Sequence, residues 1–271
     1  MSRLKNVIEQ RKAKSEKVFV AYITAGDPDL EVTAQLVLTL AHAGVDIIEL
    51  GVPFSDPLAD GPINQRAAER GLSSGTSLTK ILATVAELRR RNQEIAIVIF
   101  SYLNPIYRLG FAKFAEAARE AGVDGVLIVD FPPEEAEAYR LLMQAQGLDT
   151  IFLASPTSDV ERLQHIDAQS SGFVYYVSRT GVTGMQAQLS ATLSVEMEQV
   201  KRVLRKPVMV GFGISDGSQA VAAAALGDGI VIGSALVKII EEAQDPAERV
   251  CKVEAFARSI RSSLDAVYQR P

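Results

Sequence analysis

Two carboxylates, Glu49 and Asp60, stand where acid–base chemistry is possible. Glu49 lies inside the apolar run DIIELG, and Asp60 ends the loop that follows it. Between Ile48 and Leu50, Glu49 points to the opposite face, which in a barrel is the interior. Burial there raises the pKa of a carboxyl group, which suits a group that gives and takes a proton near neutral pH. A structural carboxylate bonded to backbone amides or tyrosine hydroxyls is the alternative.

The loop GVPFSDPLADGP, residues 51–62, carries Asp56 and Asp60 among three prolines that stiffen it. Asp60 is a candidate to hold an N–H donor of a substrate or to stabilise a developing positive charge. Asp56 is a candidate to face a partner protein. Aspartates in such loops also bond their own backbone as turn formers, and the pattern leaves both interpretations open.

Eight short apolar runs must position these side chains. The runs are nearly continuous rather than alternating, which is typical of parallel strands covered on both faces. Four of them follow Gly and an acidic residue, which predicts a helix that ends on a left-handed glycine and turns into a strand. The eight runs lie at 18–25, 43–50, 95–100, 121–129, 146–154, 173–178, 207–213 and 226–233.

Helical patterns separate the runs. Asp27 followed by Pro28 predicts the start of one helix, and Ser158 with Glu161 predicts a capping box at the start of another. A first helix is expected to cap the amino end of the strands through Leu4, Val7 and Ile8. The tail over 246–269 predicts a last helix.

Eight strand–helix units in roughly 250 residues predict a (β/α)8 TIM barrel with an extra N-terminal helix, in a single domain over residues 1–271. A doubly wound sheet is the rival fold. It usually has fewer strands and a Gly-x-Gly-x-x-Gly turn after the first strand, which TAGDPD is not.

A barrel places its active site at the carboxyl ends of the strands. Aromatic side chains among the residues there are expected to line a flat apolar pocket. Besides Glu49 and Asp60, the rim is expected to contain Tyr22, Phe100, Tyr102, Leu127, Val129, Asp130, Leu153, Tyr175 and Thr183.

Glycine-rich turns indicate a phosphate site. GFGIS at 211–215 and GSA at 233–235 follow the seventh and eighth runs, where barrels often bind phosphate through backbone N–H groups. Ser234 adds a hydroxyl. The segment 178–190, with Gly184 near its middle, is long and polar enough to act as a lid.

Composition excludes several other classes of protein. The net charge of −5 gives no electrostatic signature of nucleic-acid binding. Cys251, the only cysteine, rules out disulfide scaffolds and is expected to be a small buried hydrophobe. His42 and His165 fall in helical patterns and are expected to be structural. No strand carries a Schiff-base lysine, and no metal site is expected.

The N-terminal segment lacks the apolar core of a signal peptide, and no run is long enough to span a membrane. We therefore expect a cytoplasmic location, or its equivalent in the plastid stroma.

Five segments together resemble the tryptophan synthase alpha chain family, nearly end to end: YITAGDPD, IIELGVPFSDPLADGPINQRA, YLNPI, SRTGVTG and VGFGIS. The resemblance implies retro-aldol cleavage of indole-3-glycerol phosphate to indole and glyceraldehyde 3-phosphate. It also implies a pyridoxal-phosphate-dependent beta chain as partner in an alpha2-beta2 complex, with no cofactor in this chain.

By the same resemblance, Glu49 shuttles protons at indole C3 and the glycerol hydroxyl, Asp60 holds the indole N–H, and Thr183 positions Asp60 or closes the site. The implied phosphate contacts are Gly184, Gly211, Phe212, Gly213, Gly233 and Ser234. The implied surface for the beta chain includes Asp56, Pro57, Asn104 and Pro105.

Some positions depart from the family pattern. Tyr22 stands where phenylalanine is frequent and Phe100 where leucine is, so a differently shaped indole pocket is expected. The segment AAAALGDG is one residue tighter than usual. These differences leave Glu49, Asp60 and Thr183 untouched.

Three competing functions are weighed against this one. An indole-glycerol-phosphate synthase would require a catalytic lysine on a strand, and no predicted strand of this chain carries one. A phosphoribosyl isomerase would want aspartates after the first and fifth strands, where this chain has Thr24, with Asp27 beyond it, and Ser155. A non-catalytic subunit that only activates a partner is the third, and the intact Glu49, Asp60 and Thr183 argue against it.

Overall fold

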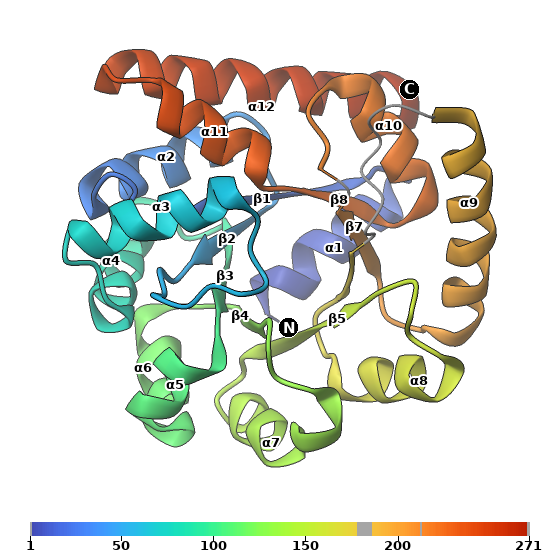
Figure 1. Ribbon diagram of the computed structural model, residues 1–271, viewed down its shortest axis with the longest axis horizontal. Coiled ribbons are helices and arrows are strands. Elements are labelled where there is room, and N and C mark those ends of the chain that lie inside the picture. Colours follow the sequence, from blue (N-terminus) through green and yellow to red (C-terminus); the bar gives the residue numbers. More distant parts are fainter. Residues whose placement is uncertain (1, 178–185, 212, 270–271) are drawn as a thin grey trace.

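Eight parallel strands form a closed barrel in which each strand pairs with the next and β1 pairs with β8 (Figure 1). The structure, a computed structural model, describes residues 2–177, 186–211 and 213–269. The predicted TIM barrel is confirmed. The strands are β1 (Val18–Thr24), β2 (Ile47–Gly51), β3 (Ala96–Ser101), β4 (Gly125–Ile128), β5 (Asp149–Ala154), β6 (Val174–Val177), β7 (Val208–Gly211) and β8 (Gly229–Ile232).

Helices surround the barrel (Figure 1). The last of them, α12, matches the helix predicted for the tail. The helices are α1 (Arg3–Ala13), α2 (Leu30–His42), α3 (Pro62–Ser73), α4 (Leu78–Arg91), α5 (Leu103–Leu109), α6 (Phe111–Ala121), the 3-10 turn η1 (Pro133–Glu135), α7 (Glu137–Ala145), α8 (Val160–Gln169), α9 (Gln186–Val203), α10 (Gly217–Leu226), α11 (Ser234–Glu242) and α12 (Pro246–Tyr268). None of the helices in the described residues is long and apolar enough to cross a bilayer.

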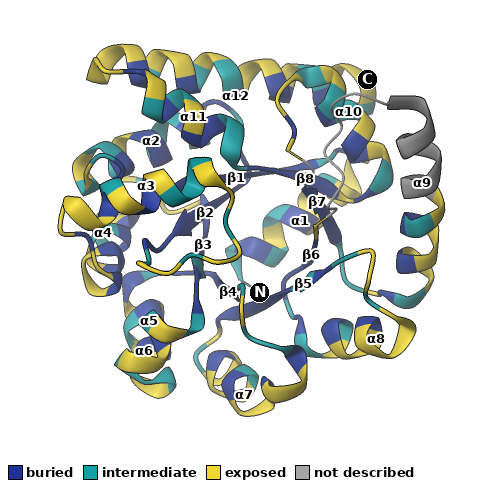
Figure 2. Cartoon of the chain, in the orientation of Figure 1, coloured by how far each residue is buried: buried dark blue, intermediate teal, exposed yellow. Residues whose placement is uncertain are grey.

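The strands separate two apolar layers. Ile48 and Leu50 point outward and pack in the layer that the helices cover, whereas Ile47 joins an inner cluster that fills the barrel. Leu4 and Ile8 of α1 belong to that inner cluster and are fully buried, so α1 closes the amino end of the barrel as predicted. Figure 2 shows the result: the strands are dark blue and the outer helix faces are yellow.

An aspartate stands at the amino end of four strands and explains the repeated Gly–acid pattern. In three of the four, the carboxylate accepts a backbone N–H from the neighbouring strand. These bonds run from Phe19 to Asp46 at 2.8 Å, from Ile97 to Asp124 at 2.9 Å and from Val208 to Asp228 at 2.8 Å. The fourth aspartate, Asp149, accepts the hydroxyl of Ser171 at 2.8 Å. The acid in each repeat therefore joins one strand to the next.

Cationic side chains of α1 pair with three of these aspartates. Arg11 contacts Asp46 at 2.8 Å, Arg3 contacts Asp124 at 3.1 Å, and Lys5 contacts Asp149 at 2.6 Å. Since all three carboxylates are nearly buried, the charges of α1 compensate carboxylates that would otherwise be costly at the bottom of the barrel.

Two predicted helix starts are wrong by one or two residues. Asp29, not Asp27, caps α2, and Asp27 instead forms a bidentate pair with Arg70 at 2.7 Å from each of two nitrogens. Asp159, not Ser158, caps α8 through a bond from the Arg162 N–H. In both cases several cap-forming residues are adjacent, and a distant partner or the turn geometry decides between them.

Two further expectations are corrected. Cys251 is exposed on α12 rather than buried. Gly44, Gly122 and Gly147 have the predicted positive φ, but Gly227 does not. At Gly227 a Cβ would lie 2.6 Å from the carbonyl oxygen of Val208, so glycine is required there for a close approach of two backbones.

Candidate active site

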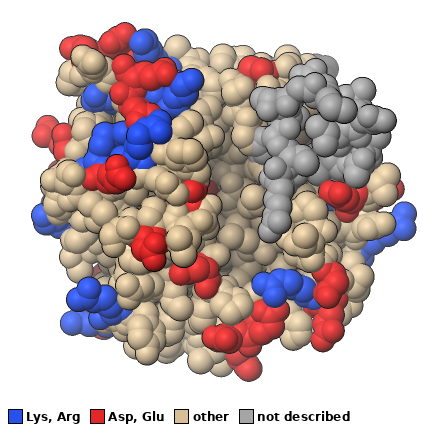
Figure 3. Space-filling view, viewed as in Figure 1, with Lys and Arg blue, Asp and Glu red and all other residues tan. Residues whose placement is uncertain are grey.

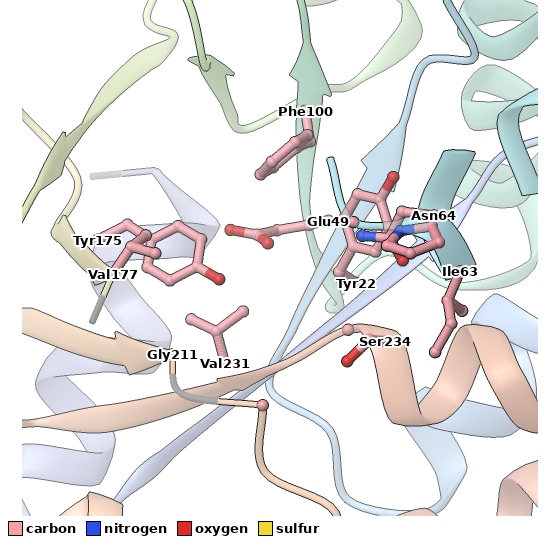
Figure 4. A pocket seen from close by; sticks show the side chains of 14 residues that line it. Tyr22, Glu49, Ile63, Asn64, Phe100, Tyr175, Val177, Gly211, Val231 and Ser234 are labelled. Carbon is pink, nitrogen blue, oxygen red and sulfur yellow. The ribbon is translucent and has the colours of Figure 1, made fainter. Parts of the chain in front are cut away.

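A cavity of about 620 Å³ opens at the carboxyl ends of the strands. Figure 3 shows this face hollowed at its centre, where the surface is largely uncharged, while basic and acidic side chains lie side by side over α3. Figure 4 shows the cavity from close by. Its lining residues are Tyr22, Glu49, Gly61, Pro62, Ile63, Asn64, Phe100, Tyr175, Val177, Gly211, Gly213, Val231, Gly233 and Ser234.

Glu49 reaches into this cavity from the middle of β2 (Figure 4). Its side chain is 0% exposed, and neither carboxylate oxygen has a hydrogen-bond partner among the described residues. Burial raises the pKa of Glu49 to about 8. A structural carboxylate would be bonded to backbone amides or tyrosine hydroxyls, and among the described residues Glu49 makes no such bond. An unpaired group with this pKa can both donate and accept a proton near neutral pH.

Asp60 lies in the loop between β2 and α3, and its side chain is held in place. The Tyr102 hydroxyl donates to Asp60 Oδ2 at 2.9 Å, and the backbone N–H of Ala59 donates to the same hydroxyl at 2.9 Å. Burial raises the pKa of Asp60, and hydrogen bonds from Tyr102 and Asn64 oppose that rise. Asp60 and Tyr102 do not themselves line the cavity, but Gly61 to Asn64, which follow Asp60, do.

Aromatic side chains form the walls beside Glu49. The rings of Tyr22 and Phe100 meet edge to face, with centroids 4.9 Å apart and planes at 70°. Tyr175 and Val177 stand across the cavity from Tyr22 (Figure 4). Gly51 makes room for this arrangement, because a Cβ there would lie 2.2 Å from the Tyr22 hydroxyl oxygen. The predicted aromatic residues Tyr22, Phe100 and Tyr175 therefore do come together.

A glycine-rich corner completes the cavity. Gly211 ends β7, Gly213 has a φ of +66°, and Gly233 precedes α11, which begins at Ser234. The first N–H groups of a helix have no partner within it, so the start of α11 offers donors to an anion. A Cβ at Gly211 would lie 2.6 Å from the Tyr175 ring, which explains glycine there. Thr183, Gly184 and Phe212 lie outside the described residues.

Leu127 and Val129 are not among the residues that line the cavity. Leu127 is fully buried in the inner cluster, and Val129 is half-buried against it. Both therefore pack inside the barrel near Phe100 and Tyr175 rather than on the cavity surface described here.

The residues predicted to face a partner lie in the loop between β2 and α3 and in the first turn of α5. Asp56 and Asn104 are exposed, and Pro57 and Pro105 are half-buried. Leu58, next to Pro57, is 85% exposed, which is unusual for a large apolar side chain.

Sequence reasoning missed several lining residues, including Ile63, Asn64, Val177 and Val231. Ile63 and Asn64 come three and four residues after Asp60, and this proximity was a usable signal. Val177 ends β6, Val231 is the next-to-last residue of β8, and both resemble core residues in sequence. Within the described residues, no group of three His, Cys, Asp or Glu side chains is arranged to hold a metal ion. His42 and His165 are exposed on α2 and α8.

Comparison with known proteins agrees with this geometry. A family model described as tryptophan synthase alpha chain matches residues 8–265. The tryptophan synthase alpha chain of Nitrosococcus oceani is 48% identical over 267 residues, covering 98% of each chain. That of Dechloromonas aromatica is 46% identical over 268 residues, covering 98% of this chain and 99% of its own.

A crystal structure of tryptophan synthase subunit alpha from Legionella pneumophila superposes with a TM-score of 0.91 at 38% identity, covering 98% of this chain and 99% of that one. The fold, the cavity and the full-length similarity all indicate the same family. The chain belongs to the tryptophan synthase alpha chain family.

Proposed function

We propose that this chain cleaves indole-3-glycerol phosphate into indole and glyceraldehyde 3-phosphate, with Glu49 and Asp60 as its catalytic residues. The alpha chain is the lyase subunit of tryptophan synthase, and the cleavage is its step in tryptophan biosynthesis. The observation that carries the assignment of residues is the Glu49 carboxylate, which is fully buried, unpaired and directed into the cavity.

The reaction needs an acid and then a base. Protonated Glu49 gives its proton to indole C3, which turns the ring into an indolenine cation. The Glu49 carboxylate then takes the proton from the hydroxyl on the chain carbon bonded to C3. That carbon becomes the aldehyde of glyceraldehyde 3-phosphate, the bond between it and C3 breaks, and the electron pair returns to the ring. A pKa of about 8 suits both steps.

Asp60 stabilises the charge that appears in the ring. Its carboxylate is fixed by Tyr102 and accepts the indole N–H, so it lies beside the nitrogen that becomes positive. Since the protonated ring itself takes up the electrons, neither a Schiff base nor a metal is required. We therefore propose that this chain has no cofactor of its own.

The phosphate end of the substrate is assigned to the glycine-rich corner. Gly211, Gly213, Gly233 and Ser234 line the same cavity as Glu49 and present backbone N–H groups and a hydroxyl. By family likeness, Gly184 and Phe212 extend this assignment, and Thr183 positions Asp60 or closes the site.

We further propose a tryptophan synthase beta chain as partner, in an alpha2-beta2 complex in which only the beta chain carries pyridoxal phosphate. The surface assigned to it contains Asp56, Pro57, Asn104 and Pro105. The exposed apolar side chain of Leu58 supports an interface at this place. Leu58→Asp is expected to weaken binding of a purified beta chain, measured by calorimetry. The control is Val267→Asp, at a 58% exposed position on α12.

The test of catalysis is indole release from indole-3-glycerol phosphate, with and without a beta chain. The wild type is expected to form indole, the beta chain is expected to accelerate it, and Glu49→Gln is expected to abolish it while the fold is retained. If the folded wild type forms no indole even with the beta chain, a non-catalytic activating subunit is the better description. If Glu49→Gln remains active, the catalytic role of Glu49 is wrong.

A further inference from the structure

Asn64 is a polar side chain in the cavity wall to which the reaction scheme above gives no role. It lies in the first turn of α3, four residues after Asp60, and is half-buried. Its side chain hydrogen-bonds to Asp60. Its amide oxygen is sealed from water and has no hydrogen-bond partner among the described residues.

The chemistry of the amide determines which atom faces Asp60. A carboxylate only accepts hydrogen bonds, so the Asn64 NH₂ group must be the donor to Asp60. The amide oxygen is then directed elsewhere. A buried acceptor without a partner costs roughly 1–3 kcal/mol, so the site gains when a ligand brings a donor to it.

The proposed substrate leaves one kind of donor for that oxygen. Its ring N–H is assigned to Asp60, and its phosphate offers acceptors to the donors around Ser234. The remaining donors are the two hydroxyl groups of the three-carbon chain between ring and phosphate. Figure 4 places Asn64 beside Tyr22, on the side of the cavity that also holds Ser234, with the Glu49 side chain extending into the space beside them. A substrate chain that extends from Glu49 to the phosphate donors at Ser234 would pass this wall.

We propose that Asn64 recognises the hydroxylated chain of the substrate. Its amide oxygen accepts a hydrogen bond from a chain hydroxyl while its amide nitrogen positions Asp60. This inference rests on the proposed function and adds a determinant of substrate specificity to it.

The test compares two ligands in a protein that cannot turn them over. Glu49→Gln and Glu49→Gln/Asn64→Leu are titrated by calorimetry with indole-3-glycerol phosphate and with indole-3-propyl phosphate, which lacks both hydroxyls. The ratio of the two dissociation constants cancels any effect that acts on both ligands through Asp60. Asn64→Leu is expected to reduce the preference for the hydroxylated ligand by about tenfold.

One matched variant completes the design. Ile63→Leu changes the same wall without removing a polar group and is expected to leave the preference unaltered. If Asn64→Leu does not fold, Asn64→Ala replaces it in the same comparison.

Equal loss of affinity for both ligands, or no loss for either, would overturn the proposal, because Asn64 would then act only through Asp60 or not at all. The proposed function would instead be refuted if the Glu49→Gln protein binds neither ligand and the wild type releases no indole. The two failures are therefore distinguishable.

Discussion

Glu49 makes the stability of this chain depend on pH in a direction opposite to that of most acidic side chains. Its pKa of about 8 in the folded chain compares with 4.5 for an ordinary glutamate. Between these two values the unfolded chain has released the proton that the folded chain still holds. Raising the pH therefore favours unfolding across this window, by about 1.4 kcal/mol for each pH unit.

The expected magnitude follows from this window. Below pH 4.5 both states are protonated and Glu49 has no effect of this kind. At pH 7 the accumulated cost is about 3 kcal/mol, and above pH 8 it levels off at about 5 kcal/mol. Glutamine has the same shape and no charge, so Glu49→Gln removes the dependence.

The assay is urea unfolding of the wild type and Glu49→Gln at pH 5, 7 and 9. The difference between their free energies of unfolding is expected to shift in favour of the variant by about 3 kcal/mol or more between pH 5 and pH 9. Any constant cost of burying the glutamine amide is the same at each pH and cancels. A difference that stays constant from pH 5 to 9 would refute the reasoning, since Glu49 would then ionise as it does in water.

Three other predictions follow from contacts of the described residues. Tyr102→Phe removes the donor to Asp60, so kcat/KM for indole-3-glycerol phosphate is expected to fall about tenfold, and the pH at which Asp60 ionises is expected to rise in the pH–rate profile. Gly211→Ala places a methyl group 2.6 Å from the Tyr175 ring and is expected to raise KM in steady-state assays; an unchanged KM would contradict the close packing. Arg89→Leu breaks a 2.7 Å buried pair with Asp124 and is expected to cost about 3–5 kcal/mol in urea unfolding, whereas a loss below 1 kcal/mol would show the pair to be dispensable.

The barrel was predictable because its signals are local. The eight apolar runs correspond to the eight strands, since a strand buried on both faces must be apolar at nearly every position. The inward direction of Glu49 followed from the alternation of a strand between Ile48 and Leu50. These inferences need no knowledge of distant contacts.

The missed features depend on contacts between distant segments. Asp27 had the sequence of a helix cap, but Arg70, 43 residues away, takes its carboxylate. Cysteine is a residue type that is usually buried, yet the face of α12 that carries Cys251 is exposed, and only the packing of that helix decides this. The sequence gives no signal for the proposed role of Asn64, because only the structure shows that its amide oxygen has no hydrogen-bond partner among the described residues.

The helix that closes the amino end of the barrel determines where a product can leave. Leu4 and Ile8 seal one end, and the inner cluster fills the barrel from there toward Glu49. The cavity that contains Glu49 opens at the opposite end, where the strands finish. Any route by which indole reaches a second protein must therefore begin among the loops around the mouth of the cavity, and the loop that carries Asp60 and Leu58 borders that mouth.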